Sequence, residues 1–510
     1  SAADGVVNQI KPDSAADGVV NQIKPDSAAD GVVDKIKPDP KDAKGYPAIK
    51  KGEGDIPANC WRIHGRDYDL TDFVDEHPGG RVSILLGKGV DCTNLFESYH
   101  IFNEPRKRLQ KYAVGDKDEP VPEDPSEFHR EFRQLLKDHF KGQGKWAHKA
   151  KWSHAALIGV ALGVEFVSWY GWYTGQTWAL LTLPLAAWII MTNVAHDGSH
   201  FATSKHPIVN EWGLAMAAPF FYTNTSWYIQ HVVSHHQETN QPGNDADLHH
   251  MPFSRWHRGV AHEGNFSGVG NLLWQVLAFT LSSVMLSVVH PFKFAIWPMG
   301  EYLIYGGEGM SSVYFGNHKE TPVPLHDGSG PTELAVMRIG GALTRAGYMI
   351  SRISLDVTLW LWSLSVLVLP WYLHGVNGKA LAFAIIPFVI ASLFFMVVTQ
   401  VSHVQEETQT NEIVNEPDFF KRQAMTSMDY SAPSNFARFW TGGLNMQSIH
   451  HVCPGLNSSH YTDIYPAFHA LCVKHGCAPA KADNIVHALY KHLKYVYRLG
   501  ANYKFPEFEM

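Results

Sequence analysis

Long runs of apolar residues, almost free of charge, occupy the chain from about residue 153 onward. Residues 153 to 173 and 177 to 195 contain one charged side chain between them, that of Glu165. An α-helix rises about 1.5 Å per residue, so each run can cross the roughly 30 Å hydrocarbon core of a bilayer. The short uncharged turn between the two runs predicts a helical hairpin that crosses a membrane twice.

A second pair of apolar runs, residues 355 to 373 and 380 to 402, repeats this pattern. Basic residues precede both pairs: Lys141, Lys145, Lys149 and Lys151 before the first, and Arg338, Arg345 and Arg352 before the second. Because the cytosolic flanks of membrane helices are enriched in Lys and Arg, the outer ends of both hairpins are predicted to be cytosolic. A fifth apolar run, residues 269 to 289, is also long enough to cross.

The first third of the chain is polar. A repeat fills residues 1 to 39, SAADGVVNQIKPD twice and then SAADGVVDKIKPD. Each copy offers about four apolar side chains, too few to offset the entropy of ordering, so residues 1 to 45 are predicted to be disordered. Because the chain starts at Ser1 rather than Met, we expect it to be processed or a fragment.

Residues 46 to 116 have the composition of a compact soluble domain. The acidic, proline-rich run DKDEPVPEDP follows and predicts a hinge. SEFHREFRQLLKDHF then places Phe128, Phe132 and Leu136 at helical spacing, which predicts an amphipathic helix packed on another surface. We therefore assign residues 117 to 150 to a linker with this helix, and residues 151 to 500 to a membrane domain.

Composition narrows the classes of function. The 510 residues carry 42 Lys and Arg against 49 Asp and Glu, a net charge of −7, so there is no basic footprint for nucleic acid. Charged residues make up 18%, below the usual quarter, as a membrane portion would explain. The five Cys form no CxxC pair, which favours a reducing compartment, and Cys472 and Cys477 are predicted to be buried thiols. Histidine, with 29 residues, is the outlier.

Three histidine clusters lie at predicted cytosolic ends of the apolar runs. HDGSH supplies His196 and His200, HVVSHH supplies His231, His235 and His236, and QSIHH supplies Gln447, His450 and His451. On an α-helix, positions i and i+4 share a face, so His196 with His200, and His231 with His235, can each grip one metal ion. Adjacent histidines such as His235 and His236 point about 100° apart and can serve two metals.

The soluble domain carries a different histidine pattern. HPGG places His77 before Gly79 and Gly80, and His100 follows 23 residues later in LFESYH. Two neutral imidazoles facing each other across a haem iron leave no open position, which suits electron transfer rather than O2 binding. This stretch resembles cytochrome b5 over about 60 residues. The resemblance implies His77 and His100 as axial ligands of haem b, and Gly79 and Gly80 would let the backbone turn close to the macrocycle.

Surface histidines at a membrane interface would account for any one of the three clusters, but not for all of them together. Converging imidazoles with few carboxylates suit iron or zinc rather than calcium or magnesium. A haem domain on the same chain favours iron, because zinc needs no electrons.

The three clusters resemble the histidine boxes of the membrane fatty acid desaturases. Gln447 in place of the first His of the third box, together with the N-terminal cytochrome b5 domain, is similar to the front-end desaturases. The resemblance implies O2 activation at two non-haem iron ions, with electrons from NADH through cytochrome b5 reductase and the haem. It implies these iron ligands, with no separate catalytic residue: His196, His200, His231, His235, His236, His450 and His451.

Four neighbouring positions are interpreted beside the boxes. His403, in TQVSH at the end of the last apolar run, sits where desaturases often place an extra ligating histidine. Gln447 offers an amide oxygen, so it would be a weak ligand or a hydrogen-bond partner. Asp245 and Asp247, in GNDADL, could orient imidazole N–H groups, although an acidic pair in a loop is usually just solvated.

Parity bears on the fifth apolar run. A composite site requires the chain to cross the membrane an even number of times between His235 and His450. The hairpin at residues 355 to 402 supplies two crossings, and one more at residues 269 to 289 would separate the boxes by about 30 Å. We therefore predict that residues 269 to 289 lie in the interface or re-enter. The predicted fold is an α+β cytochrome b5-like domain followed by an all-α membrane domain with four transmembrane helices and a cytosolic histidine-rich cap.

The leading hypothesis is a front-end desaturase of the endoplasmic reticulum membrane. It would introduce a cis double bond between an existing double bond and the carboxyl end of a polyunsaturated chain, carried as an acyl lipid or an acyl-CoA. Its haem and di-iron sites would face the cytosol, and its partners would be membrane lipids and the reductase, with no nucleic acid. Two alternatives stay open: a sphingoid long-chain base desaturase, and a membrane electron carrier that has lost the di-iron chemistry.

Overall fold

The soluble domain begins with a tight β-hairpin. The computed structural model describes residues 56–57, 59–102, 105–242, 245–248, 254–259, 267–296 and 348–501, so the predicted disorder of residues 1 to 45 falls outside the described residues. Strands β1 (Trp61–Ile63) and β2 (Arg66–Tyr68) pair antiparallel, with Trp61 opposite Tyr68. His64 and Gly65 between them have positive φ angles of 51° and 75°, the conformation that a two-residue turn requires.

Short helices cover this hairpin and position two histidines. They are η4 (Thr71–Glu76), α1 (Arg81–Leu85), α2 (Thr93–Tyr99), α3 (Arg106–Leu109) and η5 (Gln110–Tyr112). Trp61, Tyr68 and Leu86 are at most 2% exposed and form the apolar interior between hairpin and helices. His77 follows η4 directly, and His100 ends α2.

The predicted amphipathic helix is present as α4 (Glu127–His139). Ser126 caps it by accepting a hydrogen bond from the His129 backbone N–H at 3.1 Å. Phe128 and Phe132 are fully buried, and the Phe132 ring lies 5.0 Å from that of Phe468 in α21 (Tyr461–Lys474). Burial of a phenylalanine contributes about 1.5–3 kcal/mol, so these contacts anchor α4 to the C-terminal region of the chain.

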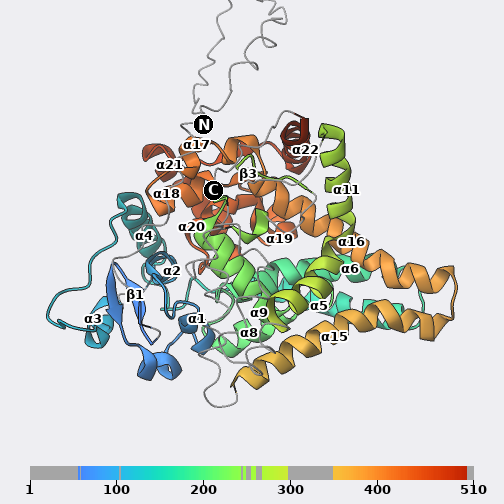
Figure 1. The fold of residues 1–510 in the computed structure, drawn as a ribbon, viewed down its shortest axis with the longest axis horizontal. Helices are drawn as coiled ribbons and strands as arrows, with labels where there is room; N and C mark the ends of the chain where they lie inside the picture. Colours follow the sequence, from blue (N-terminus) through green and yellow to red (C-terminus); the bar gives the residue numbers. More distant parts are fainter. Residues whose placement is uncertain are drawn as a thin grey trace, which may run out of the picture. The chain divides into compact units, whose positions relative to one another are not determined.

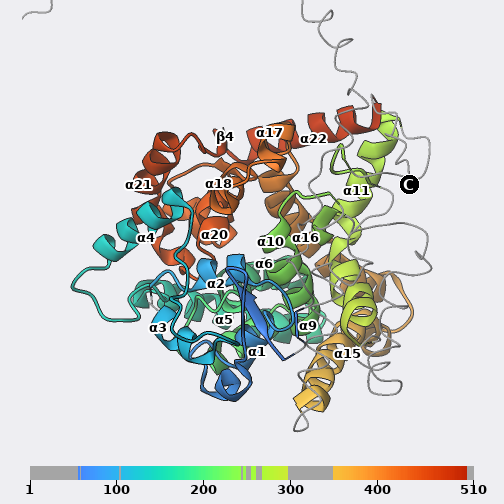
Figure 2. The ribbon, with the colours of Figure 1, turned by 60° about the vertical axis from the view of Figure 1, so that its left-hand side comes forward.

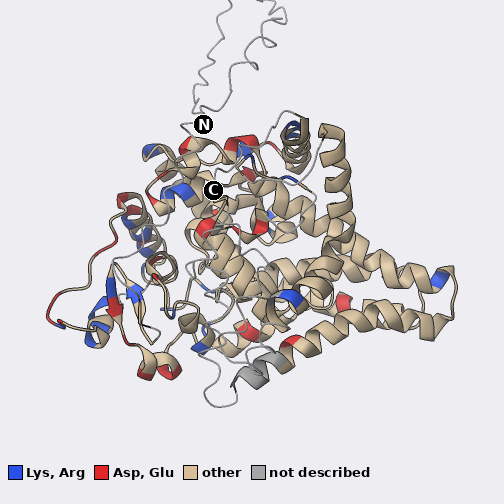
Figure 3. Ribbon diagram, in the orientation of Figure 1, with Lys and Arg blue, Asp and Glu red and all other residues tan. Residues whose placement is uncertain are grey.

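Within the described residues, five helical segments are long and apolar enough to cross a membrane. They are α5 (Trp152–Tyr173), α6 (Ala179–Ile190) with its continuation through η6 (Met191–Ala195) and α7 (His196–Ser199), α11 (Gly268–Val284) with η9 (Met285–Val289), α15 (Tyr348–His374) and α16 (Gly378–His403). Figure 3 shows that α5, α6, α15 and α16 carry very few charged residues, as the sequence predicts for membrane helices.

Two antiparallel hairpins lie side by side (Figure 1). Helix α5 packs on α6, α15 packs on α16, and α6 also packs on α16. The Trp172 Nε1–H donates to the Phe383 carbonyl oxygen at 3.0 Å across the two hairpins. The turns of the hairpins are adjacent, since a Cβ atom at Gly175 would lie 2.8 Å from His374 Cε1 and 2.6 Å from Lys379 Nζ. We refer to this end of the hairpins, at residues 174 to 176 and 375 to 377, as the distal turns.

Helix α11 takes a different course and runs at a steep angle to the paired α15 and α16 (Figure 1). Its beginning contacts the C-terminal helix α22 (Ile485–Ala501), where the Asn271 Nδ2–H donates to the Val496 carbonyl oxygen at 2.8 Å. Near the end of η9, the Val288 carbonyl oxygen accepts a hydrogen bond from Trp360 of α15 at 2.9 Å. Gln275, like Asn271, is fully buried, so α11 turns its polar groups toward protein.

The other described elements of this part of the chain include α10, α17, α18 and α20, which Figure 2 labels. They are α8 (Pro207–Ala215), α9 (Asn224–Trp227), η7 (Tyr228–His235), α10 (His236–Glu238), η8 (Ala246–Leu248), η10 (Phe292–Ile296), η12 (Glu406–Thr408), α17 (Asn411–Val414), α18 (Phe419–Met425), β3 (Met428–Tyr430), α19 (Asn435–Thr441), η13 (Leu444–Met446), α20 (Gln447–Val452), η14 (Ser458–His460) and β4 (Ala480–Ala482). Strands β3 and β4 pair in parallel, so the described part of the predicted all-α domain is mostly helical and also contains a small sheet. Three-residue strands are too short to show an alternating pattern in the sequence.

Candidate metal centre

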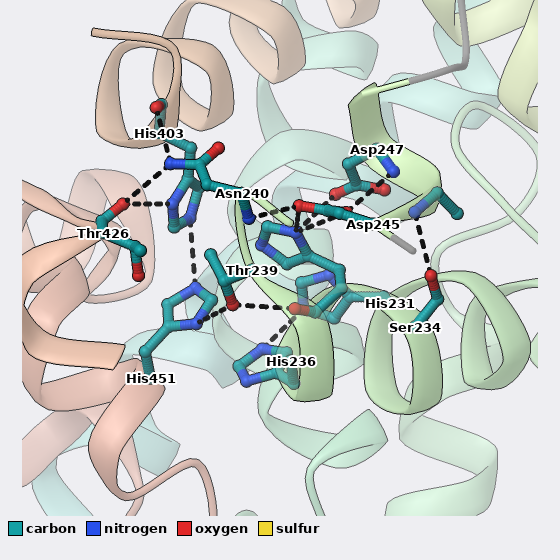
Figure 4. Close-up of polar contacts among 12 residues, drawn as sticks. His231, Ser234, His236, Thr239, Asn240, Asp245, Asp247, His403, Thr426 and His451 are labelled. Carbon is teal, nitrogen blue, oxygen red and sulfur yellow. Dashed lines mark hydrogen bonds and ion pairs between the residues drawn. The ribbon is translucent and has the colours of Figure 1, made fainter. Parts of the chain in front are cut away.

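Four segments that are distant in the sequence bring their histidines to one place, and Figure 4 shows His231 and His236 beside His403 and His451. The end of α6 and α7 supplies His196 and His200, η7 and α10 supply His231, His235 and His236, the last residue of α16 is His403, and α20 supplies Gln447, His450 and His451. Each of these side chains is 7% exposed or less. The cluster is therefore an interior site, not a set of surface histidines.

A π-helix changes which histidines of the second box lie together. Segment η7 follows the wider i→i+5 pattern, so His231 and His236 approach with their Nε2 atoms 3.2 Å apart. The α-helical i,i+4 spacing predicts His231 with His235, and these two also offer ligand atoms within 4.8 Å of one another, together with Asp247. The ring centroids are 5.4 Å apart for His231 and His235, against 4.6 Å for His231 and His236. One more π-helical segment, η6, immediately precedes His196.

The first group of ligand atoms comes from all three boxes. His196, His200, His231 and His450 each offer a ring nitrogen, and these atoms lie within 4.8 Å of one another. The His196 and His231 Nε2 atoms are 3.3 Å apart. His236 joins this group, because its Nε2 lies 3.1 Å from that of His450.

The second group combines His235, His403 and His451, whose ligand atoms also lie within 4.8 Å of one another. The Nε2 atoms of His403 and His451 are 3.0 Å apart. The Gln447 side-chain amide reaches both, with its Nε2 2.8 Å from His403 and 3.1 Å from His451. The structure thus brings together His403 and Gln447 with the predicted box residues.

These distances fit the surroundings of metal ions. Nitrogen ligands about 2.0–2.1 Å from one metal ion lie roughly 3.0–3.4 Å apart, and the Nε2 separations of 3.0 to 3.3 Å fall in this range. The Nε2 atom of His200 is buried and has no hydrogen-bond partner among the described residues. Imidazole-rich sites suit iron, zinc, copper or nickel.

Burial sets the protonation of most of these side chains. It lowers the pKa of His231, His236 and His450 well below the ordinary value, so these imidazoles are neutral, the form that binds metals. For His235, burial also opposes the charge, but the carboxylates of Asp245 and Asp247 outweigh it and raise the pKa to about 9. Binding of a metal ion at His235 would therefore release a proton.

Polar groups outside the cluster hold the second nitrogen of several rings. Both Asp245 carboxylate oxygens lie 3.1 Å from His235 Nδ1, as the sequence interpretation of this acidic pair proposes. Four other Nδ1 atoms are held as follows: His200 by Tyr99 Oη at 2.7 Å, His403 by the Thr426 carbonyl oxygen at 3.1 Å, His450 by Tyr461 Oη at 3.2 Å, and His451 by Gln423 Oε1 at 2.9 Å. Such partners fix the orientation of metal-binding imidazoles.

A cavity of about 60 Å³ adjoins the histidine cluster. His235, His403 and Gln447 line it together with apolar side chains that include Trp227 and Phe395. This arrangement can hold an apolar group against the nitrogen-rich centre.

A second, larger cavity of about 460 Å³ contains His77 and His100. Their ring centroids are 6.1 Å apart, close to the roughly 6 Å expected for imidazoles on opposite sides of one iron. His77 Nδ1 lies 3.1 Å from Ser83 Oγ, and His100 Nδ1 lies 2.8 Å from the Phe96 carbonyl oxygen, which leaves each Nε2 for the cavity. Burial, together with the neighbouring His100, lowers the pKa of His77 to about 4.

The glycines of HPGG lie at close approaches of the backbone. A Cβ atom at Gly79 would lie 2.8 Å from His77 Cε1, and one at Gly80 would lie 2.6 Å from Pro207 Cβ. Gly80 also has a φ angle of 92°, which other residues rarely adopt. A larger side chain at Gly79 would clash with the His77 ring, and one at Gly80 would clash with Pro207.

Comparison with known families gives a separate match for each of two regions of the chain. Residues 170–305 and 330–480 match the fatty acid desaturase family, and residues 50–118 match the cytochrome b5-like haem/steroid binding domain. The chain belongs to the fatty acid desaturase family. The desaturase is therefore an oxidoreductase acting on acyl chains, with a cytochrome b5-like domain at its N-terminal side.

Relatives of the desaturase align along most of its length. It is 28% identical to the acyl-lipid omega-13 desaturase of Chlamydomonas reinhardtii, over 92% of this chain and 98% of the relative. It is 27% identical to the Delta(5) fatty acid desaturase A of Dictyostelium discoideum, over 87% and 91%. It is 25% identical to the acyl-lipid (8-3)-desaturase of Mortierella alpina, over 86% and 93%.

The desaturase also contains site residues that sequence reasoning missed. Tyr99, Gln423 and Tyr461 touch His200, His451 and His450 through polar atoms. Gln423 and Tyr461 lie 28 and 11 residues from their partners, and Tyr99 lies 101 residues away in another domain. No spacing in the sequence marks them.

Proposed function

We propose that this desaturase is a front-end enzyme that places a cis double bond between an existing double bond and the carboxyl end of a polyunsaturated acyl chain. The relatives named Delta(5) and (8-3) desaturases support this position of the new bond. The observation that carries the proposal is that one chain combines a haem-type cavity with a buried centre of imidazoles beside an apolar cavity.

The proposed cofactors are one haem b and two iron ions. His77 and His100 would be the axial haem ligands, and Gly79 and Gly80 would let the backbone turn close to the macrocycle. The first iron would be held by His196, His200, His231, His236 and His450, and the second by His235, His403 and His451, with Gln447 as a weak ligand or shaping group. When bound, these groups supply one-electron transfer at the haem and O2-dependent oxidation of an unactivated C–H bond at the iron pair.

The protein's own residues would do the positioning. Trp227 and Phe395 offer apolar surface against which methylene groups can lie in the cavity that His235 also lines. The burial of the histidines excludes bulk water from the centre. Asp245 would hold the His235 Nδ1–H, so that Nε2 remains directed at the metal.

We also propose four membrane crossings, by α5, α6, α15 and α16. The distal turns lie together at one end of these hairpins, and His196 and His403 lie at the other. Helix α11 contacts α22 at its beginning and Trp360, midway along α15, at its end. In this proposal both ends of α11 lie on the histidine side of the membrane, because the chain has to cross an even number of times between His235 and His450.

The proposed location is the endoplasmic reticulum membrane, with the haem and iron sites on the cytosolic face. Residues 46 to 116 would form the haem domain, residues 117 to 150 the linker, and residues 151 to 500 the desaturase domain. NADH-cytochrome b5 reductase would supply electrons, O2 would be the oxidant, and membrane lipids would surround the hairpins.

The regiochemistry is tested by feeding polyunsaturated acids of several chain lengths to yeast that expresses the desaturase. A front-end enzyme produces a new bond at a constant distance from the carboxyl end in every chain, as located by mass spectrometry of derivatised products. A bond at a constant distance from the methyl end would contradict the proposal and favour the counting implied by the name of the omega-13 relative. Cells that express His450→Ala serve as the inactive control.

A further inference from the structure

A single hydrogen bond joins the two redox sites of the proposed function. Tyr99, the last residue of α2, immediately precedes His100. Its hydroxyl oxygen lies 2.7 Å from Nδ1 of His200, although the two residues are 101 positions apart in the chain. One side chain thus connects the neighbour of a haem-site histidine to a histidine of the first metal group.

The state of His200 defines the direction of this hydrogen bond. Its Nε2 faces the other imidazoles and has no hydrogen-bond partner among the described residues. With a metal ion at Nε2, the ring proton resides on Nδ1, and the Nδ1–H donates to the Tyr99 oxygen. The contact is therefore compatible with metal binding by His200.

The surrounding structure fixes Tyr99 between the two sites. The cavity that contains His77 and His100 is also lined by Tyr99, His200 and Phe201. The Tyr99 ring packs edge-on against Phe201, with centroids 6.0 Å apart. The haem-site cavity thus extends to the metal group without a layer of other side chains between them.

Helix α2 is itself held by ion pairs to α3 and to α4, the helix that follows the proline-rich linker. Glu97, 2% exposed, accepts a hydrogen bond from Arg133 of α4 at 3.3 Å and is also paired with Arg106. Arg133 further donates to the His100 carbonyl oxygen at 3.5 Å. These contacts hold the residues on both sides of Tyr99.

We propose that Tyr99 is the positioning residue that couples the haem electronically to the iron centre, through the path His100, Tyr99 and His200. In each transfer one electron leaves the ferrous haem, which becomes ferric, and enters the ferric iron bound by His200, which becomes ferrous. Tyr99 keeps its proton and its oxidation state, and O2, the oxidant of the desaturase reaction, later removes the electrons. The inference rests on the proposed function and adds a route to it.

The test compares full-length protein with its Tyr99→Phe variant in lipid nanodiscs that contain polyunsaturated acyl chains. The haem is reduced anaerobically, O2 is added, and haem reoxidation is followed by its visible absorbance. We expect reoxidation roughly 10-fold slower or more in Tyr99→Phe, as for the loss of other partners of metal-binding histidines. Haem content, haem reduction potential and iron content should stay unchanged.

Tyr490→Phe is the matched control, because Tyr490 of α22 is 65% exposed and lines neither of the two cavities. It should reoxidise at the unmodified rate. Excess dithionite, which reduces the iron directly, should restore single-turnover product formation in Tyr99→Phe. Equal reoxidation rates in both proteins would overturn the route, as would a loss of iron in proportion to the loss of rate. Unmodified protein without non-haem iron would overturn the proposed function as well.

Discussion

At the scale of the residue, the centre depends on what each imidazole does with its second nitrogen. Asp245 holds His235 Nδ1 with both carboxylate oxygens and also accepts a hydrogen bond from the Asn240 backbone N–H at 2.8 Å. It is 1% exposed, whereas Asp247 is partly exposed and lies 3.4 Å from the same nitrogen. The two carboxylates therefore differ in how firmly they orient His235.

Asp245→Asn should weaken the second iron site while the first site stays intact. The amide keeps the shape but loses the charge that favours the Nδ1–H of His235, and such changes cost roughly 10–100-fold in metal affinity. Iron retained per chain after dialysis against a chelator measures the effect. Asp247→Asn is the control and should retain more iron; equal losses in the two variants would argue against a special role for Asp245.

Gln447→His should impair turnover even though it restores the imidazole of an ordinary third box. Gln447 is 4% exposed and already touches His403 and His451, so a wider ring would displace one of them. We expect roughly 10-fold less product, as for other changes next to metal ligands. Gln447→Met distinguishes filling of space from a polar role. Unchanged product yield in Gln447→His would defeat the view that Gln447 shapes the site.

The sequence identified the box histidines because their spacing within each box is visible, and the structure brings them together. It did not identify Gln423 or Tyr461, which reach the centre only through the packing of α18 and α21. Ligand residues follow a local pattern, whereas their supporting partners depend on tertiary contacts.

At the scale of the element, helix geometry decides the pairing of ligands. The π-helical η7 brings the Nε2 atoms of His231 and His236 within 3.2 Å, while His235 lies with His403 and His451 and also near His231. Apolar runs and amphipathic spacing were sufficient to predict α4, α5, α6, α15 and α16. The π-helices and the short strands β3 and β4 could not be predicted, because neither produces a recognisable periodicity of apolar positions in the sequence.

Helix α11 offers a test of the proposed topology. Under the proposed topology, cysteines introduced at Val269 and Lys293 should label from the same side of the membrane, because the chain has to cross an even number of times between His235 and His450. Helix α11 contacts α22 at its beginning and Trp360, midway along α15, at its end. Val269 is 59% exposed, whereas a Cβ at the neighbouring Gly268 would lie 2.7 Å from the Tyr497 ring. A cysteine at Val376, 90% exposed at the distal turns, should label from the opposite side. Labelling of Val269→Cys and Lys293→Cys from opposite sides would contradict four crossings.

At the scale of the whole molecule, the haem-type domain and the desaturase domain are connected by side-chain contacts as well as by the polypeptide chain. Glu97 pairs with Arg133 of the linker helix, and α4 in turn packs on α21. The sequence predicted a hinge and a helix between the domains, but not these contacts, because ion pairs between distant segments leave no local pattern.

His77→Ala and His100→Ala should each abolish desaturation in yeast that lacks its own cytochrome b5. Each variant removes one imidazole from the haem cavity, while the histidines of the iron centre are untouched. Product formation, haem absorbance and iron content are measured on the same preparations. Retained iron with lost haem and lost product fits the electron-relay role; full activity in either variant would refute it.

The shared lining of the larger cavity has a consequence for assembly. Trp146 and Pro207, from outside the haem-type domain, stand on the same cavity as His77 and Phe73. A ligand that contacts both domains adds a free energy to their association, and this free energy grows with the logarithm of the ligand concentration divided by its dissociation constant. A haem bound in this cavity would stabilise the association of the two domains as well as transfer electrons. In cells that lack haem, the haem-type domain would then associate less tightly with the desaturase domain, and a protease would cleave the linker more easily. A desaturase that has its haem but receives no electrons would not show this change.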